Sequence, residues 1–427
     1  MDAVVEVTRP AQPPLPKFDP EPLRQRGWRA WRSEVGTRAF THPAFMALLR
    51  RFWPTPRLFG IRFITRYDDA RETLSRPDVF EVPWAAKMQE LAPSRCPFVL
   101  GTDDPAEHRC GEPPIMRAFR HNDIGRIARI ASRTAERIVE RADGTLDAVQ
   151  DLIAKVPIEL YREYYGLDVK DPEFALWVLA MSNYTFEKID PDPVTREVAL
   201  AGAVRLARVV DEAIERARSG HEAGDTIIAR LVAEQRTAPG ALPDDALRST
   251  MAGVITGYLP SAILAGAHAV EVLLERPAAM RAARQAVRDD DDEALARCLL
   301  EALRFRPIYP GPWRRCASDH TIAAGTARAK RIREKEKVLV FIQAAMQDGE
   351  RVSRAGRFDP DRPASDYSMV LGHGMHWCVG ASLAVTQMTQ ALKPLLVRGF
   401  RRAPGSIGRM QRFGAIPEHL TLALDPR

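Results

Sequence analysis

The chain has 427 residues, enough for two or three domains of average size or for one large one. Hydrophobic residues make up 45% and charged residues 28%, which is ordinary for a globular protein, and no run approaches the roughly 18 uninterrupted apolar residues of a membrane span. The formal net charge of +6, from 62 basic and 56 acidic residues, is a mild excess that gives no argument for nucleic-acid binding.

The cysteines and the N-terminal sequence indicate the cellular compartment in which the protein is expected. The cysteines are odd in number and scattered: Cys96, Cys110, Cys298, Cys316 and Cys378. This is neither a disulfide framework nor a zinc-binding spacing. The N-terminus lacks the basic-then-apolar pattern of a signal peptide. We therefore expect a reducing, cytoplasmic environment.

The N-terminal part begins with a proline-rich segment. Residues 1–23 read as an extended arm, and residues 24–427 are expected to form a single domain. Trp28, Trp31 and the segment 45–53 predict a short amphipathic helix, which either packs on the body or touches a membrane surface. Residues 62–67 then predict a strand, followed by a helix to Ser75.

Helical periodicity dominates the centre of the chain. Apolar residues recur at spacings of three and four over 124–140, 146–165, 172–186 and 194–219, and again from Asp225. The pattern from Pro243 to Arg276 predicts a helix on the order of 50 Å long. Residues 338–342 predict a buried strand, and the basic run 328–337 a solvated hairpin. The chain is therefore expected to be mainly helical with small β-sheets.

The most informative stretch is residues 371–380, Leu-Gly-His-Gly-Met-His-Trp-Cys-Val-Gly. Glycines let the main chain approach a bulky ligand closely. Backbone amides and the start of the next helix favour the thiolate form of Cys378. A thiolate is a soft ligand that suits iron. A buried structural cysteine between turn glycines is the alternative.

The spacing Gly-x-Gly-x-His-x-Cys-x-Gly resembles the haem-ligand loop of cytochromes P450, of the soluble bacterial type. The resemblance implies the P450 fold, with a long central helix over a haem b and Cys378 as the axial iron ligand. Leu371 stands where the family usually has phenylalanine. His376 matches a histidine that binds a haem propionate in that family.

A second segment, Asp104-Pro105-Ala106-Glu107-His108, resembles the family's Asp-Pro-x-x-His, whose histidine also binds a propionate. The family adds an arginine four residues on. Here Glu112 stands there, followed by Pro113-Pro114, which are expected to break the helix. The alternative for His108 is a helix-capping or surface role.

Two further motifs follow the long helix. Glu301 and Arg304 resemble the family's Glu-x-x-Arg pair, and Arg357 resembles the third member that locks the core behind the cysteine loop. Arg314 is the closest match to an arginine that binds a propionate, for which a bidentate guanidinium is well suited. A surface arginine in a proline-rich loop is the alternative.

The middle of the long helix departs from the family. There a Gly-x-acid-Thr sequence relays protons during oxygen activation. If the motif is aligned on Gly257, Leu259 occupies the position of the acid and Pro260 that of the threonine alcohol. If residues are instead counted back from Pro277, Ser261 occupies the position of the alcohol. Neither register supplies an acid. Leu259 also cannot hold a carboxylate substrate as the arginine of the family's peroxygenases does.

Pro260 has no backbone N–H and is expected to free the carbonyl of Thr256 and open the helix. The opening would hold water or dioxygen, with Ser261 or Thr256 as the hydroxyl donor. The alternative is a packing serine beside a proline kink.

The resemblance implies a monooxygenase that oxidises a small organic substrate with electrons from a separate ferredoxin or flavodoxin-type donor. Substrate contacts are expected from residues 84–87, 181–186, 256–261 and 308–313. One rival function is non-standard chemistry on the same fold, such as a peroxide-dependent, isomerase-like or dehydratase-like reaction, because the acid is missing. Another is a helical scaffold without haem.

Overall fold

A computed structural model of the chain describes residues 14–24, 36, 39–94, 98–170, 172–220, 224–237, 242–413 and 415–426. At residues 109–114 and 413 it describes the backbone alone. Trp28, Trp31, Cys96 and residues 1–13 of the proline-rich arm therefore lie outside the described residues, as do the side chains of Cys110 and Glu112. The described part of the arm is extended apart from one short turn, η1 (Glu21–Leu23).

The fold is mainly helical, as expected. The N-terminal helices are α2 (Pro43–Phe52), α3 (Tyr67–Leu74), α4 (Ala85–Leu91), η2 (Val99–Gly101), α5 (Pro105–Ala118), η3 (His121–Asp123), α6 (Ile124–Arg141), η4 (Ala148–Ile153), α7 (Lys155–Leu160) and η5 (Tyr161–Tyr165). The later ones are α8 (Phe174–Ser182), η6 (Asn183–Glu187), α9 (Pro193–Ser219), α10 (Ile227–Thr237), α11 (Asp244–Glu275), α12 (Pro277–Arg288), α13 (Asp292–Phe305), α14 (Ile342–Ala345), η7 (Ala364–Asp366), η8 (Ser368–Leu371), η9 (Gly374–His376) and α15 (Ala381–Arg398).

The strands form small sheets. Their bounds are β1 (Arg57–Leu58), β2 (Ile61–Ile64), β3 (Phe80–Glu81), β4 (Thr145–Asp147), β5 (Trp313–Cys316), β6 (His320–Ile322), β7 (Lys330–Ile332), β8 (Lys337–Val340), β9 (Phe400–Arg402), β10 (Gln411–Phe413), β11 (Ile416–His419) and β12 (Thr421–Leu424). The largest sheet has the order β1-β2-β8-β5-β3, in which β2 and β8 are parallel and the other pairs antiparallel. The others are β4-β12-β9, β10-β11 and β6-β7.

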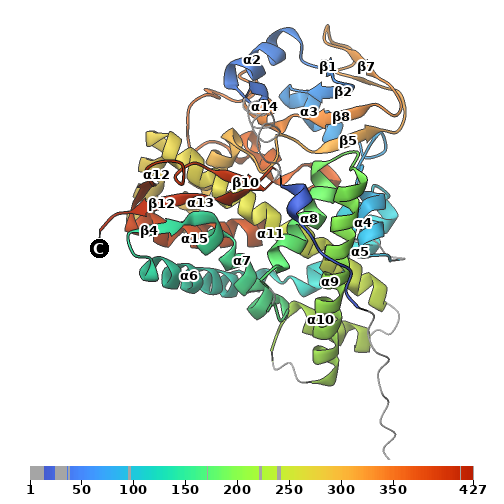
Figure 1. Cartoon of the computed structure of the whole chain (residues 1–427). Helices are drawn as coiled ribbons and strands as arrows, with labels where there is room; N and C mark the ends of the chain where they lie inside the picture. Colours follow the sequence, from blue (N-terminus) through green and yellow to red (C-terminus); the bar gives the residue numbers. More distant parts are fainter. Residues whose placement is uncertain are drawn as a thin grey trace, which may run out of the picture.

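The sheets and helices occupy different parts of the molecule. The largest sheet lies with α2 and α3 at the top of Figure 1, and most of the helices lie below it. Helix α15 packs along α6, and α11 runs through the interior between them and α8. One extensive hydrophobic core joins these helices to the sheet, because it includes buried apolar side chains of α11 and α13 as well as Ile64, Phe80 and Val338 of the sheet.

Helix α11 is the long helix that the sequence predicts. It has 32 residues, a length of about 48 Å, and begins after Pro243 with Asp244 and Asp245 in its first turn. In the described part of the chain it is the one helix that is long and apolar enough to cross a membrane. However, 78% of its most apolar window is buried inside the protein, and a core helix needs the same composition.

Three local predictions require correction. Helix α5 runs unbroken from Pro105 to Ala118, so Pro113-Pro114 do not end it. The Asp104 carboxylate caps its first turn by accepting from two backbone amides, which fixes the helix before the prolines are reached. The helix expected over 146–165 is instead β4 followed by η4, α7 and the π-helical turn η5. The strand expected over 338–342 stops at Val340, where α14 follows.

Candidate cofactor site

The loop before α15 needs glycine at two positions. Gly372 has a φ of 88°, and a Cβ added there would lie 2.7 Å from the carbonyl oxygen of His376. Gly374 has a φ of 67°, and its Cβ would lie 2.8 Å from the carbonyl oxygen of Leu74. A side chain at either position would be strained and would also collide with backbone. The two glycines therefore hold the loop in a single tight shape.

Cys378 lies at the end of this loop, partly buried. Its backbone amide donates to the carbonyl of Leu371 at 2.8 Å, which closes the loop, and α15 begins three residues later. A Cβ at Gly380 would lie 4.0 Å from Sγ of Cys378, so the backbone passes close to the sulfur.

The surroundings of the Cys378 sulfur act on the pKa of its thiol in opposite directions. Burial raises the pKa of Cys378, and the backbone of Gly380 offsets this only in part. The thiolate therefore depends on the metal ion itself, since binding a metal displaces the thiol proton.

Arg314 on β5 is a buried cation. Its side chain is 2% exposed, its guanidinium donates to the Trp313 carbonyl at 2.8 Å, and it lies 5.4 Å from the ring centroid of Trp84. Burial lowers the pKa of Arg314 to about 10, and the charge of Asp103 opposes this. Among the described residues no carboxylate lies within ion-pair distance of it. Because an unpaired buried cation is costly, this position suits an anion such as a haem propionate.

His376, two residues before the cysteine, lies in the same cluster. Its Nε2 and Oδ1 of Asp103 are 2.8 Å apart, and Oδ2 of Asp103 accepts from the Val82 amide at 2.7 Å. Nδ1 of His376 is buried and has no hydrogen-bond partner among the described atoms. His108 is close enough for its charge to lower the pKa of His376, although burial lowers that pKa most and Asp103 raises it. Asp103 thus fixes the ring and leaves Nδ1 for a ligand.

Asp103 was missed by sequence reasoning. It directly precedes Asp104, the helix cap, and a second acidic residue in a capping turn reads as redundant. Its contact with His376 joins residues 273 positions apart.

Helix α11 places Thr256 and Ser261 in different surroundings. Thr256 is 3% exposed, and its hydroxyl has no hydrogen-bond partner among the described atoms. Ser261 is half-buried. A Cβ at Gly257 would meet nothing within 4 Å, so there is open space beside this turn.

Helix α11 continues through Pro260. Tyr161 donates from its hydroxyl to the carbonyl of Ile255 at 3.0 Å, so an outside donor binds the backbone one residue before the expected opening at Thr256. The neighbouring hydroxyl of Tyr258 is buried, with no partner among the described atoms.

An apolar cluster lies between helix α11 and the cysteine loop. Phe98, Val99 and Ile115 form a buried cluster against which Val254 of α11 and Val379 of the loop pack. The residues present fit a haem: a cysteine sulfur, apolar side chains for the macrocycle, and two buried nitrogen groups, on Arg314 and His376, for its propionates.

The buried charge network behind the cysteine loop was predicted to contain Glu301, Arg304 and Arg357, and one of these three residues is different in the structure. Glu301 and Arg304 are both 0% exposed, and Arg304 donates twice to the Glu301 carboxylate, at 2.7 and 2.8 Å. The third member is Arg362, whose Nε lies 3.4 Å from Glu301. Arg357 is exposed and offers only its carbonyl, to Arg304 and Arg362. The assignment of Arg357 was therefore wrong. The prolines on either side of Arg362 were the available signal.

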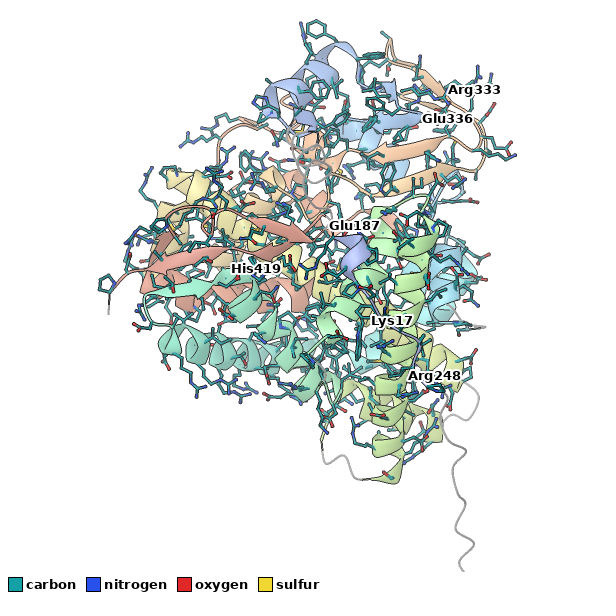
Figure 2. All side chains as sticks on the ribbon, in the orientation of Figure 1. Lys17, Glu187, Arg248, Arg333, Glu336 and His419 are labelled. Carbon is teal, nitrogen blue, oxygen red and sulfur yellow. The ribbon has the colours of Figure 1, made fainter. Side chains whose placement is uncertain are left out.

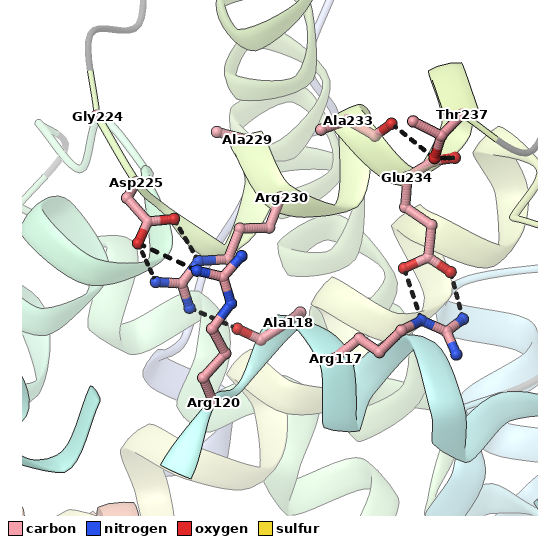
Figure 3. A pocket seen from close by; sticks show the side chains of 10 residues that line it. All are labelled: Arg117, Ala118, Arg120, Gly224, Asp225, Ala229, Arg230, Ala233, Glu234 and Thr237. Atoms are coloured by element: carbon pink, nitrogen blue, oxygen red, sulfur yellow. Dashed lines mark hydrogen bonds and ion pairs between the residues drawn. The ribbon is translucent and has the colours of Figure 1, made fainter. Parts of the chain in front are cut away.

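A cavity of about 660 Å³ lies elsewhere, between the end of α5 and α10 (Figure 3). Its charged side chains pair with one another, for example Arg117 with Glu234 and Arg230 with Asp225. None of the candidate site residues lines it.

Comparisons with known proteins identify relatives of the chain. The family model for cytochrome P450 matches residues 293–405, which include α13 and the cysteine loop. Erythromycin C-12 hydroxylase of Saccharopolyspora erythraea is 26% identical over 348 residues, covering 80% of this chain and 82% of that protein. Vitamin D(3) 25-hydroxylase of Pseudonocardia autotrophica is 26% identical over 359 residues, covering 80% and 82%.

Solved structures show the same fold. The structure of CalO2 has a TM-score of 0.75 at 21% identity and covers 92% of this chain and 98% of that one. A mutant of P450 EryK in complex with erythromycin B has a TM-score of 0.72 at 22% identity, covering 92% and 97%. The sequence matches identify the chain as a member of the cytochrome P450 superfamily, a haem-dependent monooxygenase of the oxidoreductase class.

Proposed function

We propose that this P450 oxidises, and in particular hydroxylates, a small organic substrate with dioxygen and electrons from a separate redox partner. The observation that carries the proposal is Arg314, a buried cation without a carboxylate partner among the described residues, in the same cluster as His376 of the cysteine loop. When bound, haem supplies the oxygen-activating and electron-transfer chemistry.

The chain's own residues would hold the cofactor from several elements. Cys378 binds the iron. Arg314, His376 and His108 bind the propionates, with His376 oriented by Asp103. Their positions on β5, the loop and α5 would hold the group from three separate elements, and the apolar cluster around Phe98 would keep water away from it.

Proton delivery would fall to hydroxyl groups on α11. The Thr256 hydroxyl is buried without a partner among the described atoms, and Ser261 lies about 1.4 turns further along the helix. In place of a carboxylate the chain has Leu259, which is 0% exposed, so protons would reach the hydroxyl through water. Either Thr256 or Ser261 would donate the hydrogen bond on the substrate side, because residues at this spacing do not share a helix face.

The electron donor would be a ferredoxin or flavodoxin-type protein, and both proteins would be cytoplasmic. The support is the chain's likeness to bacterial P450s over about 80% of its length. The missing acid favours a second candidate, a P450 that uses peroxide or catalyses an isomerase-like or dehydratase-like reaction.

Turnover of a spin-shifting compound separates these functions. The holoenzyme is supplied with a surrogate ferredoxin, its reductase, NADPH and dioxygen, or with hydrogen peroxide alone. We expect product with incorporated oxygen from the first mixture, and a lower yield per NADPH in Thr256→Val or Ser261→Ala. Product from peroxide alone, or a product without added oxygen, would support the second candidate.

A further inference from the structure

Glu187, at the end of η6, is a carboxylate in an unusual setting. Its Oε2 accepts from Nδ2 of Asn183 at 2.9 Å. Its Oε1 is buried and pairs with no side chain among the described residues, although the backbone of Ala415 hydrogen-bonds to the carboxyl. Figure 2 shows Glu187 in the middle of the molecule, where the sheet-rich part meets the helices. A buried carboxylate without a cationic partner is costly, so the position needs an explanation.

Lys188 and Arg412, the two cations whose charges act on Glu187, bind other groups. Lys188 donates to Asp192 at 2.6 Å and to Thr195 at 2.9 Å. Arg412 donates to the carbonyl of Ala415 at 2.9 Å and lies 3.6 Å from Glu271. No ion pair to Glu187 is formed within the part of the chain that the structure describes.

The surroundings of Glu187 place it near the cofactor site. The ring of its neighbour Phe186 lies 5.5 Å from that of Trp84, and Trp84 in turn contacts both His376 and Arg314. The segments that were expected to contact substrate, 84–87 and 181–186, therefore do meet beside the proposed propionate site.

A third such segment also reaches the carboxylate. Tyr309, from the loop after α13, shares a side-chain hydrogen bond with Ser182 and is close enough to Glu187 for the carboxylate to raise its pKa, although burial raises it more. The backbone of Ala415, in the turn between β10 and β11, faces the Glu187 carboxyl as well.

We propose that Glu187 anchors a positively charged nitrogen of the substrate, so that the enzyme acts on organic amines or on molecules carrying a basic group. The inference rests on the proposed function, because it takes these segments to form the substrate site. A ligand cation beside Oε1 would supply the cationic partner that the described residues do not provide, and it would hold the rest of the molecule against Trp84 and Phe186.

The protonation of Glu187 is consistent with this role. Burial raises the pKa of Glu187 to about 7, while Asn183, Ala415, Lys188 and Arg412 act in the opposite direction. Together with Tyr309, these are the titratable and hydrogen-bonding groups around it. The carboxyl is thus partly protonated near neutral pH, and a bound cation would favour the ionised form.

Binding to the holoenzyme tests the proposal with two probes of nearly equal shape. One is phenylbutyl trimethylammonium, which carries a fixed charge and has no lone pair for iron; the other is its neutral tert-butyl isostere. Affinity is measured by calorimetry and by the haem spin shift. We expect the cation to bind more tightly than the isostere, and Glu187→Gln to weaken the cation about tenfold while changing the isostere less than about twofold.

Glu197→Gln, on the exposed face of α9, is the matched control and should bind like the parent. Equal binding of the cation by the parent and by Glu187→Gln would overturn the proposal, as would tighter binding of the neutral isostere by the parent. Calorimetry does not depend on catalysis, so a Glu187-dependent affinity would stand even if oxygenation of substrates failed.

Stability provides a test that needs no ligand. A carboxyl whose pKa is raised on folding stabilises the fold at low pH and loses that contribution as pH rises through the folded-state value. We therefore expect the urea midpoint of Glu187→Gln, relative to the parent, to be higher at about pH 8 than at about pH 6. A lower midpoint than the parent at both pH values would show that the carboxylate is structural and would overturn the proposal.

Discussion

At the scale of single residues, Arg362 provides a sharp test of the buried ion-pair network. Its guanidinium contacts Glu301 and donates to the Ser353 carbonyl at 2.7 Å. Truncation would remove a buried charge partner, so Arg362→Ala should lower the free energy of unfolding by about 3 kcal/mol. Urea denaturation of the holoenzyme measures this change.

Arg357→Ala is the control, because its side chain is exposed and only its backbone takes part. It should shift the free energy of unfolding by less than about 0.5 kcal/mol. If Arg357→Ala lowered the free energy of unfolding more than Arg362→Ala, Arg357 rather than Arg362 would be the third member of the network.

Arg314 is expected to control how firmly haem is held. Arg314→Ala should speed haem transfer to apomyoglobin by about tenfold or more, since a propionate would lose a buried cationic partner. Arg315→Ala, whose side chain points to the opposite face of β5, should transfer haem at the parental rate. Equal rates in Arg314→Ala and the parent would exclude Arg314 from propionate binding.

The Glu301–Arg304 pair could be predicted because its two members lie one helical turn apart, and the structure shows that they pair. Cys378 and His376 also lie within a short motif, and their roles toward haem stay predictions. Asp103 contacts His376, 273 positions away in the sequence, and Arg362 contacts Glu301, 61 positions away. A local sequence pattern does not indicate contacts between residues so far apart.

At the scale of elements, Lys87 joins α4 to the end of η6. Its ammonium, 8% exposed at the residue level, donates to the carbonyls of Tyr184 and Thr185 at 3.2 and 3.4 Å, and to that of Lys188. Lys87→Met would leave these carbonyls without a donor and should lower the free energy of unfolding by about 2 kcal/mol. The exposed Lys170→Met should have no measurable effect.

The pH dependence of this lysine has a definite sign. Burial lowers the pKa of Lys87 to about 8 from its ordinary value of 10.5. Between these values the unfolded chain binds more protons, so stability from this group rises with pH. The parent should therefore gain stability relative to Lys87→Met as the pH is raised from about 8 to about 10 in urea titrations. A parallel pH dependence of the two proteins would contradict the role assigned to Lys87.

Among the helices, apolar periodicity was enough for α6, α9 and α11, whose observed bounds lie within one or two residues of those expected. It was not enough for 146–165, where a short strand precedes the helical residues and π-helical turns, with their i→i+5 hydrogen bonds, interrupt the α-helix. Nor did composition show that α5 continues through Pro113-Pro114, since tertiary packing overrides local propensity.

At the scale of the whole molecule, the fold brings together groups from distant parts of the chain at the cysteine loop, around His376. β5 contributes Arg314, α5 contributes His108, and the loop before α15 contributes His376 and Cys378. Burial makes the Arg314 cation costly in the protein alone, and the propionates of a haem would satisfy it together with the unpartnered Nδ1 of His376. Cofactor binding is therefore expected to stabilise the whole fold.

The most direct test of this account is the carbon monoxide difference spectrum of the reduced protein, recorded for the parent and for Cys378→Ser. We predict that the parent gives the red-shifted Soret band of a thiolate-ligated haem and that Cys378→Ser loses it. The same band in both proteins, or no haem absorption in parent protein expressed with ample iron, would contradict the assignment of Cys378.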